Sequence, residues 1–340
     1  MIARADLIDV LFVIVPHSLL LDIAGPAEAF RLANQHRELR GLSPRFRLRF
    51  AGPAATMPTS VGLALVELEP LPEQLSGPTW VVVTGQPTVH VHQETPSVSL
   101  TAQWLHHTLH DALHAASTPH RLLTICSGTL LAARAGVLGT RNCTTHHELL
   151  DTLRMLAPRA QVIANRVFVV DGQLASSAGI TAGIDLALHL IGEECGEALA
   201  ASVAEDMVVY LRRSQRDPEL SPFHMHRRHL HATVHRVQDA IVTKPDHGWD
   251  MAELAKVGNT TERHLLRLFI ENAGVSPLHY LRLIRLERAR QSLEYGATVT
   301  RAAAVAGFRS GLQLRRAWNR QWGGTPRDVA RAASTINGRS

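Results

Sequence analysis

The chain has 340 residues, of which 45% are hydrophobic and 19% charged, and its formal net charge is +5 at neutral pH. This composition is that of a globular protein long enough for two domains. No apolar run approaches ~18 residues, so we expect no membrane span, and the first residues lead into a core strand and not a secretory leader. The chain has three cysteines, an odd number, from which we expect a protein of the reducing cytoplasm.

The first two thirds of the chain alternate apolar, strand-like runs with helical stretches. Strands are predicted at residues 7–15, 45–51, 80–84, 121–125, 167–170 and 174–177. Helices are predicted at residues 22–33, 98–116, 130–135, 182–192 and 197–211, with Pro26 in the first turn of the first helix. This alternation predicts an α/β domain with a mostly parallel sheet and right-handed crossovers.

Ligands of such domains bind beyond the carboxyl ends of the strands, which selects residues 22–28, 84–87 and 126–129. Cys126 follows a predicted strand, and Gly128 allows a tight turn into the next helix. Backbone N–H groups and the helix dipole there favour a thiolate, and the same turn suits a carboxylate or another anion. A buried, inert cysteine is the alternative interpretation. Cys143 and Cys195 lack this setting and are interpreted as structural.

Residues 212–226 are polar, contain Pro218 and Pro222 and follow a predicted helix, so we expect an interdomain linker there. Five histidines then lie close together at positions 224, 226, 229, 231 and 235. Imidazole binds zinc, nickel and copper, but no cysteine accompanies these residues. We therefore expect solvated or DNA-adjacent histidines and no metal site.

Residues 251–328 contain the same helical pattern twice. At an offset of 49 residues, Ala255 aligns with Ala304, Gly258 with Gly307, Arg267 with Arg316, Gly274 with Gly323 and Pro277 with Pro326. Each copy predicts a short helix, a turn at the first of these glycines, a second amphipathic helix and a stop at Gly-x-[Ser/Thr]-Pro. This is the helix-turn-helix pattern.

The second helix of each copy has an apolar row and a polar face. The rows expected to be buried are Leu265, Leu268 and Phe269 in the first copy, and Leu314 and Trp318 in the second. The residues expected to face DNA are Thr260, Thr261, Arg263, His264 and Arg267 in the first copy and Arg309, Ser310, Leu312, Gln313 and Arg316 in the second. Arginine can bind guanine edges or phosphates, glutamine can bind adenine, and leucine can contact a thymine methyl group. An ordinary solvated helix face is the alternative.

Residues 278–293 join the two copies with strong helix formers and no Gly or Pro, which predicts a stiff helical rod. Two readers on one face of a duplex are expected about one turn, ~34 Å, apart. Charge supports this interpretation, because from Arg227 onward 19 Lys and Arg residues accompany nine Asp and Glu, whereas the preceding part has 16 and 21. A basic C-terminal third is typical of a DNA-binding module.

The region from about residue 236 to residue 331 resembles the DNA-binding domain of the AraC/XylS family. The motifs that carry this resemblance are R-H-L-L-R-L-F, G-V-S-P-L-H-Y-L, R-L-E-R-A-R and V-A-G-F-R-S. Two features depart from the family pattern. Trp318 stands where the family usually has Phe, and P-R-D-V-A-R-A replaces the usual Pro-x-x-Tyr-Arg ending. The resemblance implies an all-α double helix-turn-helix domain whose partner is double-stranded promoter DNA.

The region from about residue 6 to residue 213 resembles the ThiJ/PfpI domain of the class I glutamine-amidotransferase-like superfamily. The motifs that carry this resemblance are L-L-L-D-I-A-G-P-A-E-A-F, T-I-C-S-G-T and S-S-A-G-I-T-A-G-I-D-L-A-L-H-L. This resemblance implies a flavodoxin-like α/β fold in which Asp22 faces the strand-end cysteine, Gly85 belongs to a loop offering an amide, and His146 lines the same pocket. The whole chain resembles GlxA-type transcriptional regulators, which implies a homodimer.

We therefore expect a ligand-sensing domain over residues 6–213, a linker over 214–229, a DNA-binding domain over 230–332 and a flexible tail over 333–340. The expected ligand-binding residues are Asp22, Gly25, Pro26, Glu28, Gly85, Cys126, Ser127 and His146. Hydrolases of the superfamily often have His directly after the nucleophilic Cys, where this chain has Ser, so a general base is not evident.

The leading hypothesis is a sequence-specific transcriptional regulator without a cofactor, controlled by a small metabolite that is amino-acid-like or a quaternary amine. One alternative is a cysteine-dependent amidase or glyoxal-type hydrolase fused to a DNA-binding module, with Cys126 as its nucleophile. Another alternative is a redox switch at Cys126 that needs no metabolite.

Overall fold

The computed structural model describes residues 7–114, 118–209, 213–215, 226–227, 229–294 and 296–329. The chain divides into two compact units, Met1–Glu219 and Leu220–Ser340. The boundary between them falls inside the range 214–229 that the sequence assigns to a linker, and most of that range lies outside the described residues. Within the described part, no helix is long and apolar enough to cross a membrane.

A seven-stranded sheet forms the centre of the first unit, in the order β10-β11-β7-β6-β1-β2-β5. Its strands are β1 (Ile8–Val13), β2 (Phe46–Gly52), β5 (Glu69–Pro70), β6 (Thr79–Val83), β7 (Arg121–Ile125), β10 (Phe168–Asp171) and β11 (Leu174–Ser177). All neighbours are parallel except β10 and β11, which are antiparallel. The apolar strands β1 and β6 are buried along their whole length, as expected of strands covered on both faces.

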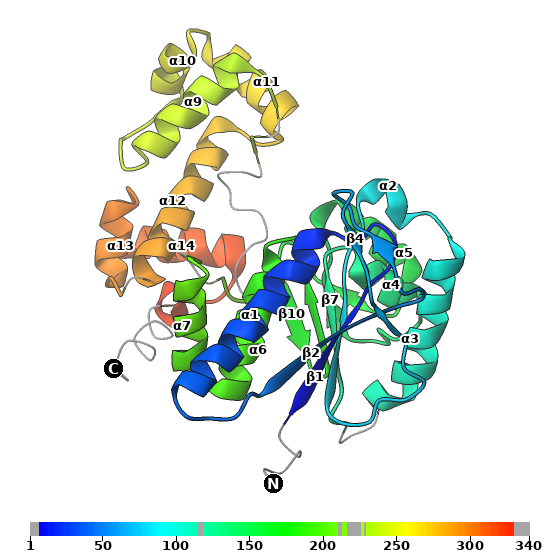
Figure 1. Ribbon diagram of the computed structural model, residues 1–340. Helices are drawn as coiled ribbons and strands as arrows, with labels where there is room; N and C mark the ends of the chain where they lie inside the picture. Colours follow the sequence, from blue (N-terminus) through cyan, green and yellow to red (C-terminus); the bar gives the residue numbers. More distant parts are fainter. Residues whose placement is uncertain are drawn as a thin grey trace. The chain divides into compact units, whose positions relative to one another are not determined.

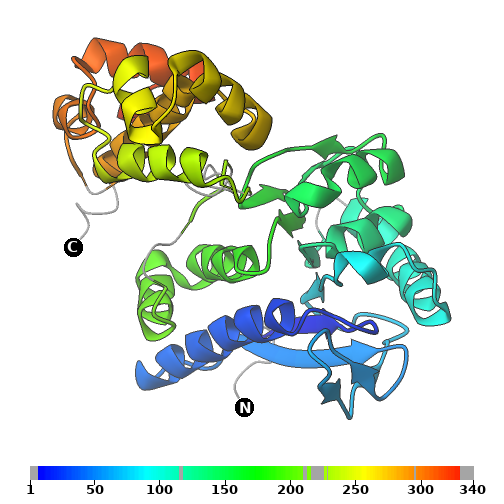
Figure 2. The same ribbon diagram turned by 90° about the horizontal axis from the view of Figure 1, so that it is seen from above.

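Helices cover both faces of this sheet (Figures 1 and 2). One face carries α1 (Leu20–Leu39), α6 (Ala182–Cys195) and α7 (Glu197–Asp206). The other face carries α2 (Thr88–Val91), α3 (Pro96–His114), α4 (Gly128–Arg134) and α5 (Leu150–Leu156). The short elements are β3 (Met57–Pro58), β4 (Ala64–Leu65), β8 (Asn142–Cys143), β9 (Gln161–Val162) and the 3-10 turn η2 (His147–Leu149).

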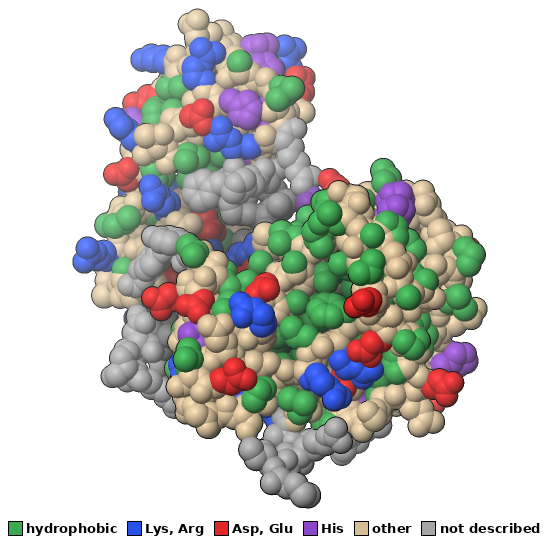
Figure 3. All heavy atoms as spheres, in the orientation of Figure 1, with side chains coloured by type: hydrophobic (Ala, Val, Ile, Leu, Met, Phe, Trp, Pro, Cys, Tyr) green, Lys and Arg blue, Asp and Glu red, His purple; other side chains and the backbone are tan. Residues whose placement is uncertain are grey.

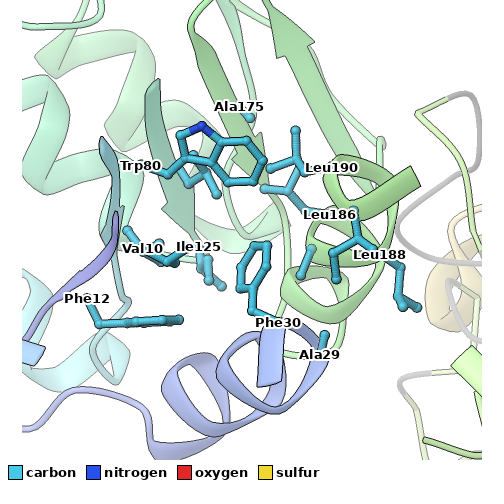
Figure 4. Close-up of a cluster of buried hydrophobic side chains, with 14 of the residues drawn as sticks. Val10, Phe12, Ala29, Phe30, Trp80, Ile125, Ala175, Leu186, Leu188 and Leu190 are labelled. Carbon is cyan, nitrogen blue, oxygen red and sulfur yellow. The ribbon is translucent and has the colours of Figure 1, made fainter. Parts of the chain in front are cut away.

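The core under α1 and α6 is built around aromatic side chains (Figure 4). The ring of Phe30 on α1 meets Trp80 on β6 edge-on, with centroids 5.9 Å apart, and lies 4.9 Å from Phe46 on β2. Leu186 and Leu190 of α6 close the same cluster. Large apolar side chains from three strands and two helices thus fix α1 against the sheet, which determines where its first turn lies.

The position of Pro26 differs from the sequence-based prediction. Helix α1 begins at Leu20, so Pro26 lies inside the helix and not in its first turn. Proline removes one helical N–H, which leaves the carbonyl of Asp22 without its usual donor four residues later. Pro26 is buried, and a Cβ added to Gly183 of α6 would lie 3.3 Å from Pro26 Cγ. This close packing of α1 on α6 offsets the local cost of the proline.

The other predicted strands and helices of the first unit are present to within three residues, except that α1 ends at Leu39, six residues after its predicted end, and α7 ends at Asp206, before residues 207–209 of the predicted helix. Residues 115–116 and 210–211, at the ends of two predicted helices, lie outside the described part. The parallel sheet with helices on both faces confirms the predicted α/β fold class.

The described part of the second unit is helical. Its helices are α9 (Ala232–Thr243), α10 (Met251–Gly258), α11 (Glu262–Ala273), α12 (Pro277–Glu294), α13 (Val299–Val305) and α14 (Gly311–Trp322). Helices α9 to α11 pack at one end of α12, and α13 and α14 pack at the other end (Figure 1). The predicted rod is confirmed, because α12 has 18 residues and is therefore about 27 Å long.

The two ends of α12 belong to separate apolar cores. The first core contains Phe269 of α11 and Tyr280 of α12, and the second contains Trp318 of α14 and Leu293 of α12. Each copy of the duplicated pattern therefore has its own buried cluster, and α12 contributes to both.

Candidate nucleic-acid interface and strand-end site

Each copy of the duplicated pattern forms two helices joined by a tight turn, α10 with α11 and α13 with α14. In the first copy, Asn259 ends α10 with a left-handed φ of 51°, a conformation that asparagine tolerates. Thr261 then begins α11, and its hydroxyl accepts a hydrogen bond from His264 N (3.3 Å). In the second copy, Ser310 begins α14 and accepts from Gln313 N (3.2 Å). Thr261 and Ser310, predicted to face DNA, thus also cap the helices that carry the polar faces.

The predicted division of α11 into a buried row and an exposed face is confirmed. The three residues of its predicted apolar row, Leu265, Leu268 and Phe269, are buried in the first core, whereas Arg263, His264 and Arg267 are exposed and Thr260 is half-buried. Arg267 donates to His264 Nδ1 (3.0 Å) and lies 3.8 Å from Glu271. Because both partners are exposed, these contacts can give way to a phosphate or a base.

Helix α14 has the same arrangement. Leu314 and Trp318 are buried, whereas Arg309, Leu312, Gln313 and Arg316 are exposed. Lys and Arg side chains are spread over the visible face of the second unit in Figure 3. The two copies therefore present equivalent polar faces with different side chains.

Gln313 has a role inside the helix start that the sequence reading did not include. Its side-chain Oε1 accepts a hydrogen bond from the backbone N–H of Arg309 (2.7 Å), while its backbone N–H donates to Ser310 Oγ. Binding adenine through both ends of the amide requires the oxygen as well as the nitrogen. Gln313 must therefore exchange this backbone contact for a base contact when it reads adenine.

In the first unit, Cys126 lies at the sharp turn from β7 into α4, here called the elbow (residues 126–128). Its φ is 54°, in the left-handed region, and its side chain is buried. A Cβ on Gly128 would lie only 2.3 Å from Val83 O, so the turn requires glycine there. Cys126 N donates to Ser177 O (3.0 Å), and Thr145 Oγ1 donates to Cys126 O (2.8 Å).

Asp22 reaches the elbow from the first turn of α1. Its Oδ2 accepts a hydrogen bond from Gly85 N (3.0 Å). A Cβ on Gly85 would lie 2.8 Å from that oxygen and 3.0 Å from Cys126 Cβ, so these three residues adjoin one another. Burial raises the pKa of Asp22 to about 7, against the opposing effect of the Gly85 hydrogen bond. Near neutral pH, this carboxyl group is therefore present both protonated and ionised.

Two groups predicted to bind ligand are engaged within the protein. The amide of Gly85 is bonded to Asp22. The hydroxyl of Ser127 accepts from Gln86 N (2.7 Å) and donates to Gln86 O (2.8 Å). The first contact ties the loop after β6 to α1 and the second ties the same loop to the elbow, so Gly85 and Ser127 hold these three segments together.

Other predicted ligand residues take different places. A Cβ on Gly25 would lie 2.7 Å from Ile184 Cγ1, so Gly25, like Pro26, packs closely against α6. Glu28 is exposed and pairs with Arg31 (2.6 Å). His146 follows Thr145, is partly exposed, and accepts from Glu148 N (3.4 Å). The structure therefore brings Asp22, Gly85, Cys126 and Ser127 together, with His146 next along the chain and Glu28 at the surface.

Sequence reasoning missed two hydroxyl groups near the elbow. Asp22 Oδ1, Thr144 Oγ1 and Ser177 Oγ are buried without a hydrogen-bond partner among the described residues. Thr144 O accepts from Thr129 Oγ1 (3.0 Å), and Ser177 O accepts from Cys126 N. Buried polar atoms without partners cost free energy, so each of these atoms is a candidate for a hydrogen bond to a ligand or a water. Ser177 ends β11, so the strand-end rule applied to that predicted strand would have found it, whereas the two-residue strand β8 before Thr144 was not predicted from the sequence.

A hollow of about 410 Å³ lies elsewhere in the first unit, beside α3 and the strand ends of β2 and β5. Its lining includes Leu68, Leu100 and Trp104 and contains no charged side chain. The first unit also shows many hydrophobic side chains on the face drawn in Figure 3. None of the lining residues belongs to the elbow, so the hollow and the polar site are distinct.

The described histidines after the linker are half-buried and not fully solvated, and the other expectation, histidines next to DNA, stays a prediction. His226 Nδ1–H donates to Ala273 O (2.8 Å), at the end of α11. The rings of His229 and His235 lie 4.4 Å apart, and His231 is also half-buried. His224 lies outside the described residues. Across the described ranges, no group of three or more His, Cys, Asp or Glu side chains is placed to hold a metal ion.

The other two cysteines have unreactive surroundings. Cys143 is fully buried in the core under α3, and burial, with a smaller effect of Asp171, raises the pKa of its thiol to about 11. Burial also raises the pKa of Cys195. A thiol with a raised pKa holds little thiolate, so neither residue has the character of a nucleophile.

Two family profiles match the chain. The profile described as "Helix-turn-helix domain" matches residues 254–332, and the profile of the DJ-1/PfpI family matches residues 105–193. Each match falls in the unit where the structure shows the corresponding fold.

Similar curated proteins are mostly regulators. The HTH-type transcriptional regulator GbdR of Pseudomonas aeruginosa is 34% identical over 214 residues, covering 61% of this chain and 57% of its own length. The HTH-type transcriptional regulator GlxA of Rhizobium meliloti is 29% identical over 220 residues, covering 63% and 66%. The isonitrile hydratase of Pseudomonas putida is 37% identical over 90 residues, covering 25% and 37%. The chain therefore matches 57% of the length of GbdR. The chain thus combines a helix-turn-helix domain with a domain of the DJ-1/PfpI family, and over part of their length it is similar to the HTH-type transcriptional regulators GbdR and GlxA.

Proposed function

We propose that this chain is a sequence-specific, DNA-binding transcriptional regulator that acts in the cytoplasm. The observation that carries the proposal is the pair of helix-turn-helix units at the two ends of α12. Each unit buries its apolar row and exposes arginines, Arg263 and Arg267 in the first and Arg309 and Arg316 in the second. Arginines on an exposed second helix suit guanine edges and phosphates in a major groove.

The test is enrichment of binding sequences from a randomised double-stranded DNA pool by the full chain, followed by affinity measurements over a range of salt concentrations. We expect one preferred sequence and an affinity that falls as salt rises. Replacing both Arg263 and Arg267 with Ala should weaken binding to that sequence. Arg236→Ala, an exposed arginine on α9, is the matched control. Enrichment of no sequence, or equal binding by the double variant, would contradict the proposal.

We further propose that the elbow binds the small-molecule effector. Asp22 Oδ1, Thr144 Oγ1 and Ser177 Oγ offer one carboxyl oxygen and two hydroxyls without partners. A carboxyl group that ionises near neutral pH attracts an amine, and the hydroxyls can bond to a carboxylate or carbonyl oxygen. This combination supports an amino-acid-like metabolite. A quaternary amine has no N–H to donate and would interact with Asp22 by charge alone.

A thermal-shift screen of amino acids, their N-methylated forms and other nitrogenous metabolites tests this site, because a ligand that binds the native state raises its melting temperature. The shift should be lost in Asp22→Asn and kept in Asp111→Asn, which removes an exposed carboxylate from α3. The effective ligand should also change DNA affinity, since coupling requires unequal binding to two states. A ligand whose shift survives Asp22→Asn would place the effector elsewhere.

We propose a homodimer as the functional form, on the basis of the family resemblance. Sedimentation of the full chain with and without the enriched DNA tests it, and a monomer in both measurements would contradict it.

A cysteine enzyme is the second candidate function. The left-handed φ of Cys126 at the elbow and the similarity to an isonitrile hydratase over 90 residues favour it. The test is turnover of small amides, dicarbonyls and isonitriles by the purified chain, with Cys126→Ser as the inactive control and Cys143→Ser as the matched control. Turnover that Cys126→Ser abolishes would support an enzyme, and turnover that persists in that variant would exclude Cys126 as the nucleophile.

A further inference from the structure

The two helix-turn-helix units share α12 but not a core. Residues of α9, α10 and α11 bury against the first half of α12, and residues of α13 and α14 bury against its second half. A single shared helix sets how far apart the two units lie. The packing of each copy on α12 holds its rotation about that helix, and contacts that pass directly from one copy to the other add to this restraint.

Such a contact forms beside Arg285, in the middle of the shared helix α12. Its Nε donates to Pro245 O (2.7 Å), and one terminal nitrogen donates to His247 O (2.7 Å). Both carbonyls belong to the α9–α10 loop (residues 244–250), which is part of the first helix-turn-helix copy. The guanidinium is half-buried, and burial lowers the pKa of Arg285. Hydrogen bonds from a charged, partly desolvated donor to two carbonyls are among the stronger polar contacts in proteins.

The same loop closely approaches Gly307, which lies in the turn of the second helix-turn-helix copy. This residue lies between α13 and α14 with a φ of +78°. A Cβ there would lie 2.5 Å from Asp246 Cα, 2.9 Å from Pro245 O and 3.1 Å from Arg285 Nε. The left-handed φ and the lack of space both require glycine. The α9–α10 loop, Arg285 and Gly307 therefore form one contact between the two helix-turn-helix copies. Gly307 lies two residues before Arg309 and three before Ser310, the cap of α14.

We propose that Arg285, with the close approach at Gly307, fixes the orientation of α11 relative to α14 and so sets which spacing of two DNA half-sites the chain accepts. Arg285 acts here as a positioning residue, because both of its printed bonds are to the protein backbone. A rigid pair of readers rejects a half-site displaced by one base pair, since that step rotates it by roughly 35° about the duplex. If α11 and α14 can move relative to each other, the chain accepts several spacings between the half-sites, and its affinity for the preferred spacing is lower. This role rests on the proposed DNA-binding function.

The first measurement needs no DNA. Spin labels are placed on α11 and α14 by Ile270→Cys and Asn319→Cys, both at exposed positions, in the full chain with Cys126→Ser and Cys195→Ala, which remove the other thiols open to labelling. We expect one narrow distance distribution, and a broadened or shifted one after Arg285→Ala or Gly307→Ala. Arg288→Ala removes an exposed arginine from the same helix and should leave the distribution unchanged. An unchanged distribution after Arg285→Ala overturns the proposal.

The second measurement uses the DNA sequence enriched by the unmodified chain. Insertion of one or two base pairs between its two halves should weaken binding by the unmodified chain and by Arg288→Ala about tenfold or more. Arg285→Ala should bind the original spacing less tightly and lose most of the preference for it. Equal spacing preference in Arg285→Ala and the unmodified chain overturns the proposal.

Two controls separate the possible failures. If Arg285→Ala does not fold, as judged by circular dichroism, Arg285→Lys replaces it, because a single ammonium on a flexible stem cannot reproduce the two-pronged contact. If the unmodified chain enriches no DNA sequence, the proposed function fails, whereas the label distances still decide whether Arg285 orients the helices.

Discussion

Replacing Asp22 with Asn should make the first unit more stable at neutral pH and remove a pH dependence of its stability. The carboxyl group is fully buried, and burial raises its pKa from 3.8 to about 7. The folded state therefore holds a proton on Asp22 over a pH range in which the unfolded chain has lost it. Stability must then fall as pH rises from about 4 to about 7 and stay low above that.

The size of the effect follows from the shift. About three pKa units correspond to about 4 kcal/mol once the group is fully ionised in the native state, of which about 2 to 3 kcal/mol develops between about pH 5 and pH 8. Asparagine does not titrate, but its amide N–H group would replace an oxygen without a partner and cost about 1 to 3 kcal/mol at every pH. At about pH 8 we therefore expect a net gain of about 1 to 3 kcal/mol.

The assay is urea unfolding of the full chain at several pH values by tryptophan fluorescence, using the transition of the first unit, which contains Trp80 and Trp104. Asp9→Asn is the control. Burial raises the pKa of Asp9, but hydrogen bonds from Arg47 and Arg49 outweigh this and hold it below its usual value. That variant should lose stability by the same amount throughout the range. A difference between Asp22→Asn and the unmodified chain that does not change with pH would refute the reasoning.

Three further predictions concern single side chains. Arg263→Ala or Arg267→Ala should each weaken binding to the enriched DNA by ~1 to 3 kcal/mol if the side chain contacts a base edge, as measured by fluorescence anisotropy; unchanged affinity and sequence preference in both variants would remove α11 from the interface. Gly128→Ala should prevent formation of the elbow, because its Cβ would lie 2.3 Å from Val83 O, and a melting temperature equal to that of the unmodified chain would show that the turn can relax. Trp318→Ala should destabilise the second core by about 3 to 5 kcal/mol, which hydrogen exchange of α13 and α14 would report as lost protection, with α10 and α11 as the internal reference.

The sequence predicts best where the physical signal is local. The buried row and exposed face of α11 follow from spacing within one helix, as with Leu265 beside His264, and the structure confirms them. Strand β7 has the predicted bounds because a short, apolar run before a tight turn leaves few alternatives. The two turns were detectable because the pattern occurs twice, but only Gly307 lies in its turn: Gly258 is the last residue of α10, and Asn259 is the left-handed residue of the first turn.

Contacts between distant segments leave little trace in the sequence. Asp22 and Gly85 are 63 residues apart, and the bond that joins them uses a backbone amide, which every residue except proline has. The bond from Arg285 to Pro245 O spans 40 residues and likewise uses backbone. The interior position of Pro26 was missed because helix rules treat proline as a first-turn residue, whereas tight packing on α6 overrides that preference.

The two polar faces sit on one polypeptide and are not identical, and this has a consequence for the direction of binding. At equivalent positions, α11 carries Arg263 and His264, whereas α14 carries Leu312 and Gln313. A symmetric pair of equal subunits reads a palindrome and binds it alike in both directions. With the proposed DNA-binding function, each chain with its unlike halves would distinguish the two directions of the DNA that it covers, whether it binds as a single copy or as one half of the proposed homodimer.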